Sequence, residues 1–279
     1  MTTLPTLNII GAGKVGRTLA RLWQERQVFC VGDVLNRSLD SSQQAVLAIG
    51  GGRAAASLGD MAPAQCWLLA VADDAIETCC QSLARTGLLD AGPQGKPIVF
   101  HCSGALSSHA LASARDRGAL TASVHPIRSF ADAQELASLE GAWCGIEGDT
   151  GALETLSSGF EALGARMVAI QAEHKLVYHS AAVFACNYLV TLLDVAVQAY
   201  GRSGVPPDTA LAMMESLVRG TVDNVFRLGP AQALTGPIAR GDLATVRRQE
   251  HEVRQWNGEI GELYHQFVKL TMELAVRKR

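Results

Sequence analysis

The stretch Leu7-Asn8-Ile9-Ile10-Gly11-Ala12-Gly13-Lys14-Val15-Gly16 joins a short apolar run to three glycines spaced as Gly-x-Gly-x-x-Gly. The run Leu7–Ile10 predicts a buried strand, and the apolar positions of Val15–Glu25 predict a helix directly after it. A glycine-rich turn between a strand and a helix suits phosphate groups, because the helix N-terminus offers free N–H groups and the positive end of its dipole.

The three glycines have different roles in such a turn. Gly11 allows the tight turn, Gly13 allows the backbone to approach a pyrophosphate, and Gly16 allows the helix to pack close to the sheet. We therefore expect a Rossmann unit in which a dinucleotide contacts Gly11, Ala12, Gly13, Lys14, Val15 and Gly16. The alternative is a tight glycine turn that binds no ligand.

The rest of the first half alternates short apolar runs with helical patterns, as βαβ units do. The predicted strands are Leu7–Ile10, Val31–Asn36, Cys66–Val71, Ile98–His101, Leu120–Val124, Trp143–Ile146 and Met167–Ile170. Helical patterns such as Ser41–Ile49 lie between them. This alternation predicts a parallel, doubly wound sheet with right-handed crossovers.

Helical patterns dominate the chain after Ile170. A long one spans 172–200, and Pro206-Pro207-Asp208 begins the next, with Asp208 as the expected N-cap. Asp242 is expected to cap a later helix. We predict an α/β chain with two domains, a Rossmann domain over residues 1–170 and an all-helical domain over residues 171–279.

Composition excludes several classes of protein. The 279 residues carry a net charge of −3 with no basic cluster, so we expect no nucleic-acid partner. The seven cysteines are scattered and never spaced as CxxC, which favours reduced thiols in a cytoplasmic protein and no metal site. The apolar run Ala181–Tyr200 contains Asn187, Asp194 and Gln198, so we expect a buried helix rather than a membrane span.

The end of the second predicted strand indicates the cofactor. Enzymes that use NAD usually place an acidic residue there to bind the ribose hydroxyls, whereas this chain has Asn36, Arg37 and Ser38. A guanidinium and a hydroxyl suit a 2′-phosphate, so NADP is favoured over NAD. Asp33 is the competing acid, and we place it at the start of the strand, too far from the ribose. The alternative for Arg37 is a solvated surface charge.

Two further turns follow predicted strands at the edge where ligands of open α/β sheets bind. Val71, Ala72 and Asp73 are expected to line the cofactor cleft, although the acid pair Asp73-Asp74 also suits a helix N-cap. Ser103-Gly104 is expected to offer a hydroxyl and a backbone N–H to the nicotinamide amide or to the substrate.

Several motifs in order resemble those of a bacterial family assigned as oxidoreductases, which combine a Rossmann-like domain with a helical domain of unknown function, DUF2520. The resemblance is carried by 100–106 (FHCSGAL), 123–130 (SVHPIRSF), 173–182 (EHKLVYHSAA), 186–189 (CNYL), 229–230 (GP), 233–238 (ALTGPI) and 240–242 (RGD). The layout is more distantly similar to β-hydroxyacid dehydrogenases, ketopantoate reductase and pyrroline-5-carboxylate reductase. The resemblance implies a second domain like the C-terminal domain of 6-phosphogluconate dehydrogenase, nicotinamide chemistry and a homodimer packed through the helical domain.

The β-hydroxyacid dehydrogenases have a catalytic lysine in the region that Lys175 occupies here, followed one turn later by Asn. In this chain the residue one turn later is His179, so the two side chains share a helix face that we expect to point into a cleft between the domains. Lys175 is the predicted proton donor or polarising group for a carbonyl, and His179 the group that orients it or relays the proton. The alternative is a partly exposed lysine and a hydrogen-bonded histidine. Asn187 is expected on the flank of that face.

His125 and Arg128 follow a strand end on the cofactor side of the sheet. His125 and Ser103 are candidate hydrogen-bonding groups for the substrate, and Arg128 is a candidate clamp for a carboxylate. The local alternatives are turn or cap residues and a surface charge.

Together these features predict an NADP-dependent oxidoreductase that transfers hydride between nicotinamide and a small oxo, hydroxy or imino acid. Two alternatives stay open. One is a non-catalytic NADP-binding regulatory module, and the other is a reductase that uses NADP with another hydride carrier, such as a deazaflavin.

Overall fold

The computed structural model describes residues 4–91, 95–128 and 138–278. The chain divides into two compact units, Met1–Phe184 and Ala185–Arg279. The motif at 123–130 is covered only in part, since residues 129 and 130 lie outside the described residues. The predicted division at 170/171 stays a prediction.

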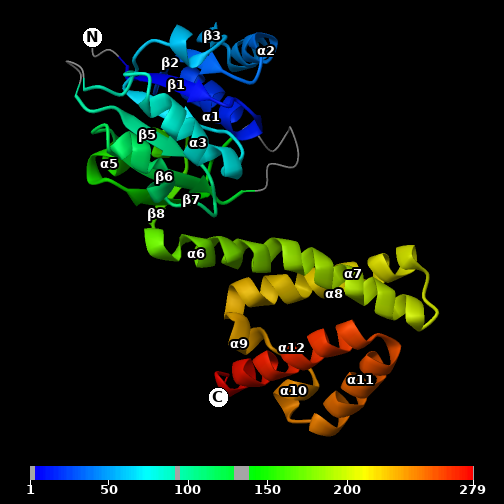
Figure 1. The fold of residues 1–279 in the computed structure, drawn as a ribbon. Coiled ribbons are helices and arrows are strands. Elements are labelled where there is room, and N and C mark those ends of the chain that lie inside the picture. The colour runs from blue at the N-terminus through cyan, green and yellow to red at the C-terminus, as the bar shows by residue number, and fades with distance from the viewer. Residues whose placement is uncertain (1–3, 92–94, 129–137, 279) are drawn as a thin grey trace. The chain divides into compact units, whose positions relative to one another are not determined.

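The first unit is built on one eight-stranded sheet in the order β3-β2-β1-β4-β5-β6-β7-β8 (Figure 1). The strands are β1 Thr6–Ile10, β2 Cys30–Leu35, β3 Arg53–Ala55, β4 Cys66–Leu69, β5 Ile98–His101, β6 Leu120–Pro126, β7 Trp143–Gly148 and β8 Arg166–Ala169. Strands β1 to β6 are parallel, β7 runs antiparallel to β6, and β8 is parallel to β7. The seven predicted strands are present, and β3 was missed because Arg53-Ala54-Ala55 has no apolar run.

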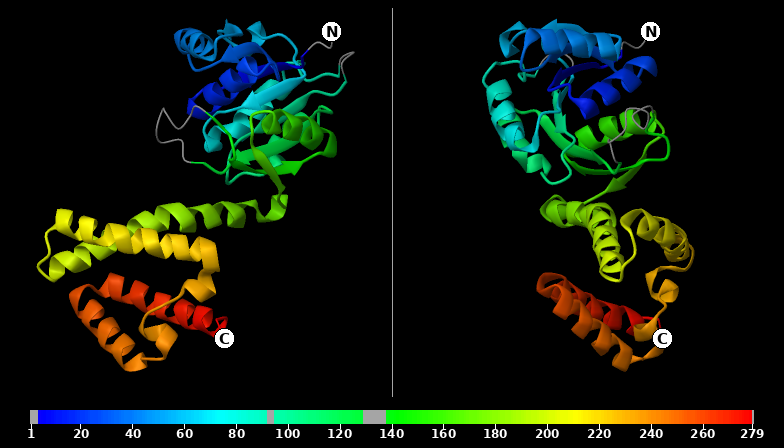
Figure 2. Two further views of the ribbon diagram at one scale, coloured as in Figure 1. Left: turned by 180° about the vertical axis from the view of Figure 1, so that it is seen from behind. Right: turned by 90° about the vertical axis from the view of Figure 1, so that its right-hand side faces the viewer.

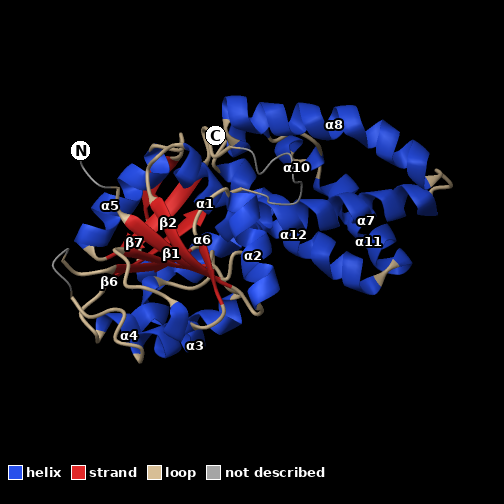
Figure 3. Ribbon diagram, turned by 90° about the horizontal axis from the view of Figure 1, so that it is seen from above, coloured by secondary structure: helices blue, strands red, loops and turns tan. Residues whose placement is uncertain are grey.

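Helices cover both faces of this sheet, which confirms the doubly wound class (Figure 3). They are α1 Lys14–Glu25, α2 Leu39–Ile49, α3 Asp73–Ala84, α4 Ala112–Arg115 and α5 Thr150–Glu161. Helix α6 Lys175–Ala182 follows β8 and a 3₁₀ turn. One core joins α1, α2 and α5 to one face, and a second core joins α3 and α4 to the other. Trp23 centres the first core, because its ring meets Phe29, Phe100 and Phe160 edge-on at centroid distances of 5.2, 6.2 and 5.1 Å and its Nε1–H donates to Gly159 O at 2.8 Å.

The second unit is helical. Its helices are α7 Tyr188–Arg202, α8 Pro207–Leu228, α9 Pro230–Ala233, α10 Pro237–Arg240, α11 Leu243–Trp256 and α12 Gly258–Val276. Helices α7 and α8 lie side by side, as do α11 and α12 (Figure 2). Asp242 caps α11 as predicted, accepting from Thr245 N at 3.1 Å.

Two predictions for the helical part were wrong in detail. The single helix expected over 172–200 is a 3₁₀ turn at Ala172–His174, then α6, then a π-helical turn at Val183–Asn187, then α7. Pro206, not Asp208, is the N-cap of α8, because a proline at the first helical position already supplies the required φ. Asp208 lies in the first turn, where its charge still favours the helix dipole.

The apolar run Ala181–Tyr200 is not buried within this chain. Leu189 is 37% exposed and Val190 is 65% exposed, because α7 packs along only part of its surface against α8. By length and composition alone, Ala172–Arg202 is the one helix in the described part of the chain that would suffice to cross a membrane.

Candidate functional site

The glycine-rich turn has the geometry that its sequence predicts. Gly11 has a φ of +85°, and a Cβ on it would lie 2.8 Å from Val71 N. A Cβ on Gly16 would lie 2.8 Å from the Cβ of Ala70, so only glycine lets α1 approach the sheet here. Nothing lies within 4 Å of a Cβ on Gly13, and no side chain caps the N-terminus of α1. The turn is therefore closely packed at Gly11 and Gly16 and has free space at Gly13.

A cleft of about 760 Å³ lies in front of this turn. It is lined by Ile10, Gly11, Ala12, Gly13, Arg17, Leu35, Asn36, Arg37, Ser41, Gln44, Ala70, Val71, Ala72 and Ala75. Seven of the predicted cofactor residues are among them, whereas Lys14, Val15, Gly16, Ser38, Asp73, Ser103 and Gly104 are not. Sequence reasoning missed Arg17, although its position one turn into a helix that starts at the cleft was the available signal.

Asn36 holds the wall of this cleft together. Its Oδ1 accepts from Ala12 N at 2.7 Å, and its Nδ2 donates to Ser41 O at 2.8 Å. The side chain thereby ties the glycine-rich turn to α2. Ser38 caps α2 by accepting from Ser41 N at 3.2 Å. Arg37 is exposed beside them and makes no hydrogen bond or ion pair with the described residues.

Asp33 is engaged away from the cleft. It lies in the middle of β2, not at its start as expected, and is 4% exposed. Its carboxylate accepts from Arg53 at 2.7 and 2.9 Å and from Ala62 N at 2.7 Å. The hydrogen bond to Asp33 also raises the pKa of Arg53. The acid that would favour NAD is thus committed to a structural ion pair.

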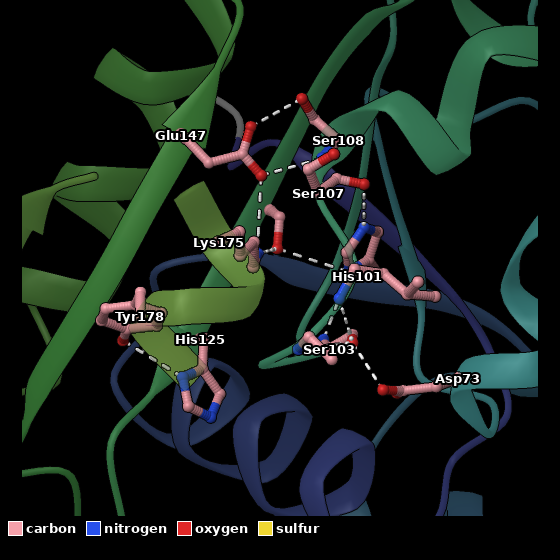
Figure 4. A network of polar contacts seen from close by, with 12 residues as sticks. Asp73, His101, Ser103, Ser107, Ser108, His125, Glu147, Lys175 and Tyr178 are labelled. Carbon is pink, nitrogen blue, oxygen red and sulfur yellow. Dashed lines mark hydrogen bonds and ion pairs between the residues drawn. The ribbon is translucent and has the colours of Figure 1, made fainter. Parts of the chain in front are cut away.

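A buried ion pair lies deeper in the first unit (Figure 4). Lys175, in the first turn of α6, is 1% exposed, and its Nζ donates to Ser123 Oγ on β6 and, at 3.4 Å, to Glu147 Oε1 on β7. Glu147 also accepts from Ser108 N at 2.8 Å and from Ser108 Oγ at 2.7 Å. Burial lowers the pKa of Lys175, and the charge of Glu147 opposes that shift. The ammonium does not open onto a cleft as expected but is enclosed by these partners.

His101, Ser103 and Asp73 continue the network at the ends of β5 and β4 (Figure 4). His101 Nδ1 accepts from Ser103 N at 3.2 Å and its Nε2 lies 3.1 Å from Ser107 O, so the proton is on Nε2. Ser103 Oγ donates to Asp73 Oδ2 at 2.6 Å. Asp73 does not cap its own helix, whose N-cap is Ala72. Burial, aided by Lys175, lowers the pKa of His101 to about 4.

Three aromatic side chains converge beside Gly104. His125 Nδ1 lies 3.1 Å from the Tyr178 hydroxyl, and its ring centroid is 5.6 Å from that of His179. A Cβ on Gly104 would lie 2.8 Å from His125 Nε2 and would overlap His179 Nδ1. His179 Nδ1 is buried and has no hydrogen-bond partner. Burial, with the charges of His179 and Lys175, lowers the pKa of His125 to about 4.

The structure thus brings together five predicted residues within the first unit: Ser103, Gly104, His125, Lys175 and His179. Two others lie elsewhere. Arg128 donates to Ser138 O, which ties the chain locally, and Asn187 is an exposed residue of the second unit. Sequence reasoning missed Glu147 and Tyr178. A carboxylate directly after the apolar run Trp143–Ile146 was the available signal for Glu147.

We expect Lys175→Met to lower the free energy of unfolding by about 3–5 kcal/mol, because it leaves the carboxylate of Glu147 buried without its counter-charge. Urea denaturation measures this loss. The double variant Lys175→Met/Glu147→Gln should lose less than the two single losses combined.

The matched control is Arg219→Met, which breaks an exposed ion pair with Glu215 of 2.9 Å. It should cost no more than about 1 kcal/mol. A Lys175→Met variant as stable as this control would contradict the importance of the buried pair.

Stability should also fall as the pH drops from about 6.5 toward 4. His101 and His125 have a pKa of about 4 in the folded chain, against about 6.5 when unfolded. In this window the unfolded chain binds two protons that the folded chain does not, so acid favours unfolding. Between pH 6.5 and 4, the melting temperature of the double variant His101→Asn/His125→Asn should depend less on pH than that of the unmodified protein. An equal dependence on pH in both proteins would show that the two histidines do not cause the loss of stability.

Comparison with known proteins gives two matching family models. A Rossmann-like domain matches residues 3–126, and the domain of unknown function DUF2520 matches residues 142–271. No curated protein matches the chain.

Solved structures resemble the chain over nearly its whole length. Protein TM1727 from Thermotoga maritima is 28% identical, with a TM-score of 0.78 over 98% of this chain and 99% of that one. A candidate NADP oxidoreductase from Bacteroides fragilis is 19% identical, with a TM-score of 0.75 over 98% and 99%. An imine reductase from Myxococcus stipitatus in complex with NADP⁺ is 17% identical, with a TM-score of 0.68 over 96% and 94%. At the two lower identities the likeness concerns the fold, and the chain joins a Rossmann-like domain to a DUF2520 domain.

Proposed function

We propose that this protein is an NADP(H)-dependent oxidoreductase that transfers hydride between nicotinamide and a small oxo, hydroxy or imino acid. The observation that carries the proposal is the cleft in front of Gly11–Gly13, whose rim presents the unpartnered guanidinium of Arg37. The solved relatives described as NADP oxidoreductases and reductases support the same class.

The residues of the cleft fit a dinucleotide phosphate. The first N–H groups of α1 have no acceptor within the helix, and the space in front of Gly13 admits a pyrophosphate. Arg37 and Arg17 supply positive charge for a 2′-phosphate. Bound NADPH would supply the hydride. Asn36 keeps the turn in place through its bond to Ala12 N.

His179 is the proposed catalytic residue, and Lys175, whose ammonium is enclosed by Ser123 and Glu147, is proposed to act through its charge. The Lys175 ammonium supplies a fixed positive charge close to the site, which favours negative charge developing on a substrate oxygen. His179, beside Gly104, is the proposed proton donor. The turn Ser103-Gly104 is the proposed hydrogen-bonding group for the nicotinamide amide or the substrate, through the backbone N–H of Gly104, because the Ser103 hydroxyl already donates to Asp73 Oδ2 and accepts from Ala105 N and Leu106 N.

The cellular compartment and the oligomeric state are also proposed. The seven cysteines are all free, which supports a reducing compartment such as the cytoplasm. The exposed apolar side chains of the second unit, such as Leu211, Leu217 and Phe226, support a homodimer packed through that unit.

The activity is tested by following NADPH absorbance with a panel of small 2-oxo acids and cyclic imino acids. We expect oxidation of NADPH with at least one of them. Tight NADPH binding with no turnover on the whole panel would favour the regulatory module, and a co-purified deazaflavin would favour the other hydride carrier.

We expect Arg37→Ala to weaken NADPH binding by at least tenfold, which is about 1.4 kcal/mol, while NADH binding changes little. The reason is that the guanidinium meets only the 2′-phosphate that distinguishes the two. Titration of the intrinsic tryptophan fluorescence measures both affinities. Arg85→Ala, which removes an exposed arginine at the C-terminus of α3, is the control, and an equal loss for both cofactors would argue against a 2′-phosphate contact.

A further inference from the structure

The contact between Tyr178 and His125 determines what the site can hold. Tyr178 lies on α6 and His125 on β6, and their rings meet edge-on at 5.7 Å (Figure 4). The hydroxyl of Tyr178 lies 3.1 Å from His125 Nδ1. Burial raises the pKa of Tyr178, so the phenol keeps its proton and is able to donate it to Nδ1. When it does so, the proton of the neutral imidazole is on Nε2.

Two glycines make room for this arrangement. A Cβ on Gly145 of β7 would lie 2.7 Å from Tyr178 Cζ, and a Cβ on Gly104 would lie 2.8 Å from His125 Nε2. Larger residues at either position would push the rings away. The chain thus has no side chain at the two points where Tyr178 and His125 need the space.

The Nε2 atom of His125 takes no part in the hydrogen bonds of the described part of the fold. Nε2 makes no hydrogen bond with the described residues, and the neighbouring Nδ1 of His179 is buried without a partner among them. Polar atoms in a core are paired, so the unpaired buried nitrogen of His179 beside His125 indicates a place for a ligand. Both nitrogens lie against Gly104, on the same side of the sheet as Ser103.

We infer that Tyr178 is a positioning residue that fixes the Nε2–H form of His125, and that this N–H binds the carbonyl oxygen of an oxo-acid substrate. The inference rests on the proposed function and narrows its substrate class. A neutral N–H donor needs a lone pair, which a carbonyl oxygen has and a protonated imine nitrogen lacks. The site therefore favours an oxo acid over an imino acid.

The reaction balances with groups already described. Bound NADPH would supply the hydride from a C–H bond of its nicotinamide and be oxidised to NADP⁺. Hydride addition forms a C–H bond at the carbonyl carbon and breaks the C=O π bond, whose electron pair moves to oxygen. The Nε2–H of His125 stabilises that oxygen without giving up its proton, as a neutral imidazole does for a developing oxyanion. His179 relays the proton, since it takes one from water on one ring nitrogen as it gives one to the oxygen from the other.

The first test is the tautomer itself, measured on the full-length protein without substrate. Long-range ¹H–¹⁵N correlation spectra at pH 7.5 distinguish a protonated Nε2 from a protonated Nδ1. We expect His125 to carry its proton on Nε2, and Tyr178→Phe to produce a mixture of the two forms. A proton on Nδ1 in the unmodified protein would overturn the inference, whether or not any substrate is known.

The second test is kinetic. Tyr178→Phe should lower kcat/KM for the best oxo acid by roughly 10- to 100-fold and leave the Kd of NADPH unchanged, because the cofactor cleft is untouched. The control is Tyr264→Phe, which removes a hydroxyl bonded to Gln249 in the second unit and should not alter kcat/KM. Unchanged kcat/KM in Tyr178→Phe would overturn the positioning role.

The third test separates substrate class from cofactor use. His125→Gln keeps an N–H donor near the place of Nε2 and should retain more activity than His125→Leu. A cyclic imine reduced with a higher kcat/KM than every 2-oxo acid would overturn the inference and leave the proposed oxidoreductase standing. No binding of NADPH would overturn the proposed function and leave the tautomer result standing.

Discussion

The ion pair between Lys175 and Glu147 is the interaction on which the candidate site depends. It joins the start of α6 to β7, while Ser123 and Ser108 bring β6 and the segment after β5 to the same charges. Enclosing two charges costs free energy, and only their mutual attraction and added hydrogen bonds offset it. The pair therefore holds α6 in one place against the sheet, and α6 carries Tyr178 and His179 with it.

The pair also controls charge in its surroundings. Lys175 helps to lower the pKa of both His101 and His125 to about 4, so each imidazole is neutral near pH 7. A neutral imidazole has one donor and one acceptor, and its neighbours choose which is which. Ser103 N donates to Nδ1 of His101 and so determines its tautomer, and Tyr178 is the group that we propose to do the same for His125. One buried cation thereby helps to keep both histidines neutral.

The sequence is sufficient to predict features whose causes are local. Gly11 and Gly16 follow from a strand, a tight turn and a helix adjacent in the chain, and the parallel sheet follows from alternating patterns. Strand β3 was missed because pairing with β2 rather than its own residues makes it a strand. Lys175 was singled out, but not its burial, because its partner Glu147 is 28 residues away on another strand. The ion pair of Asp33 was not predicted for a similar reason, since its partners Arg53 and Ala62 are 20 and 29 residues away.

The lack of a side chain at Gly104 and Gly145 determines where the cluster of Tyr178, His125 and His179 forms. Gly104 follows β5 and Gly145 lies within β7, and neither spacing nor pattern relates them in the sequence. In the fold Gly104 makes room for the rings of His125 and His179, and Gly145 makes room for the ring of Tyr178. Gly104 and Gly145 thus let the rings of this cluster approach the backbone more closely than other residues would permit. Gly11 and Gly16 have the same effect at the glycine-rich turn. Close approach at the turn suits a phosphate. At Gly104 it leaves two imidazole nitrogens without partners among the described residues, and a small carbonyl compound would provide the hydrogen bonds that these nitrogens lack.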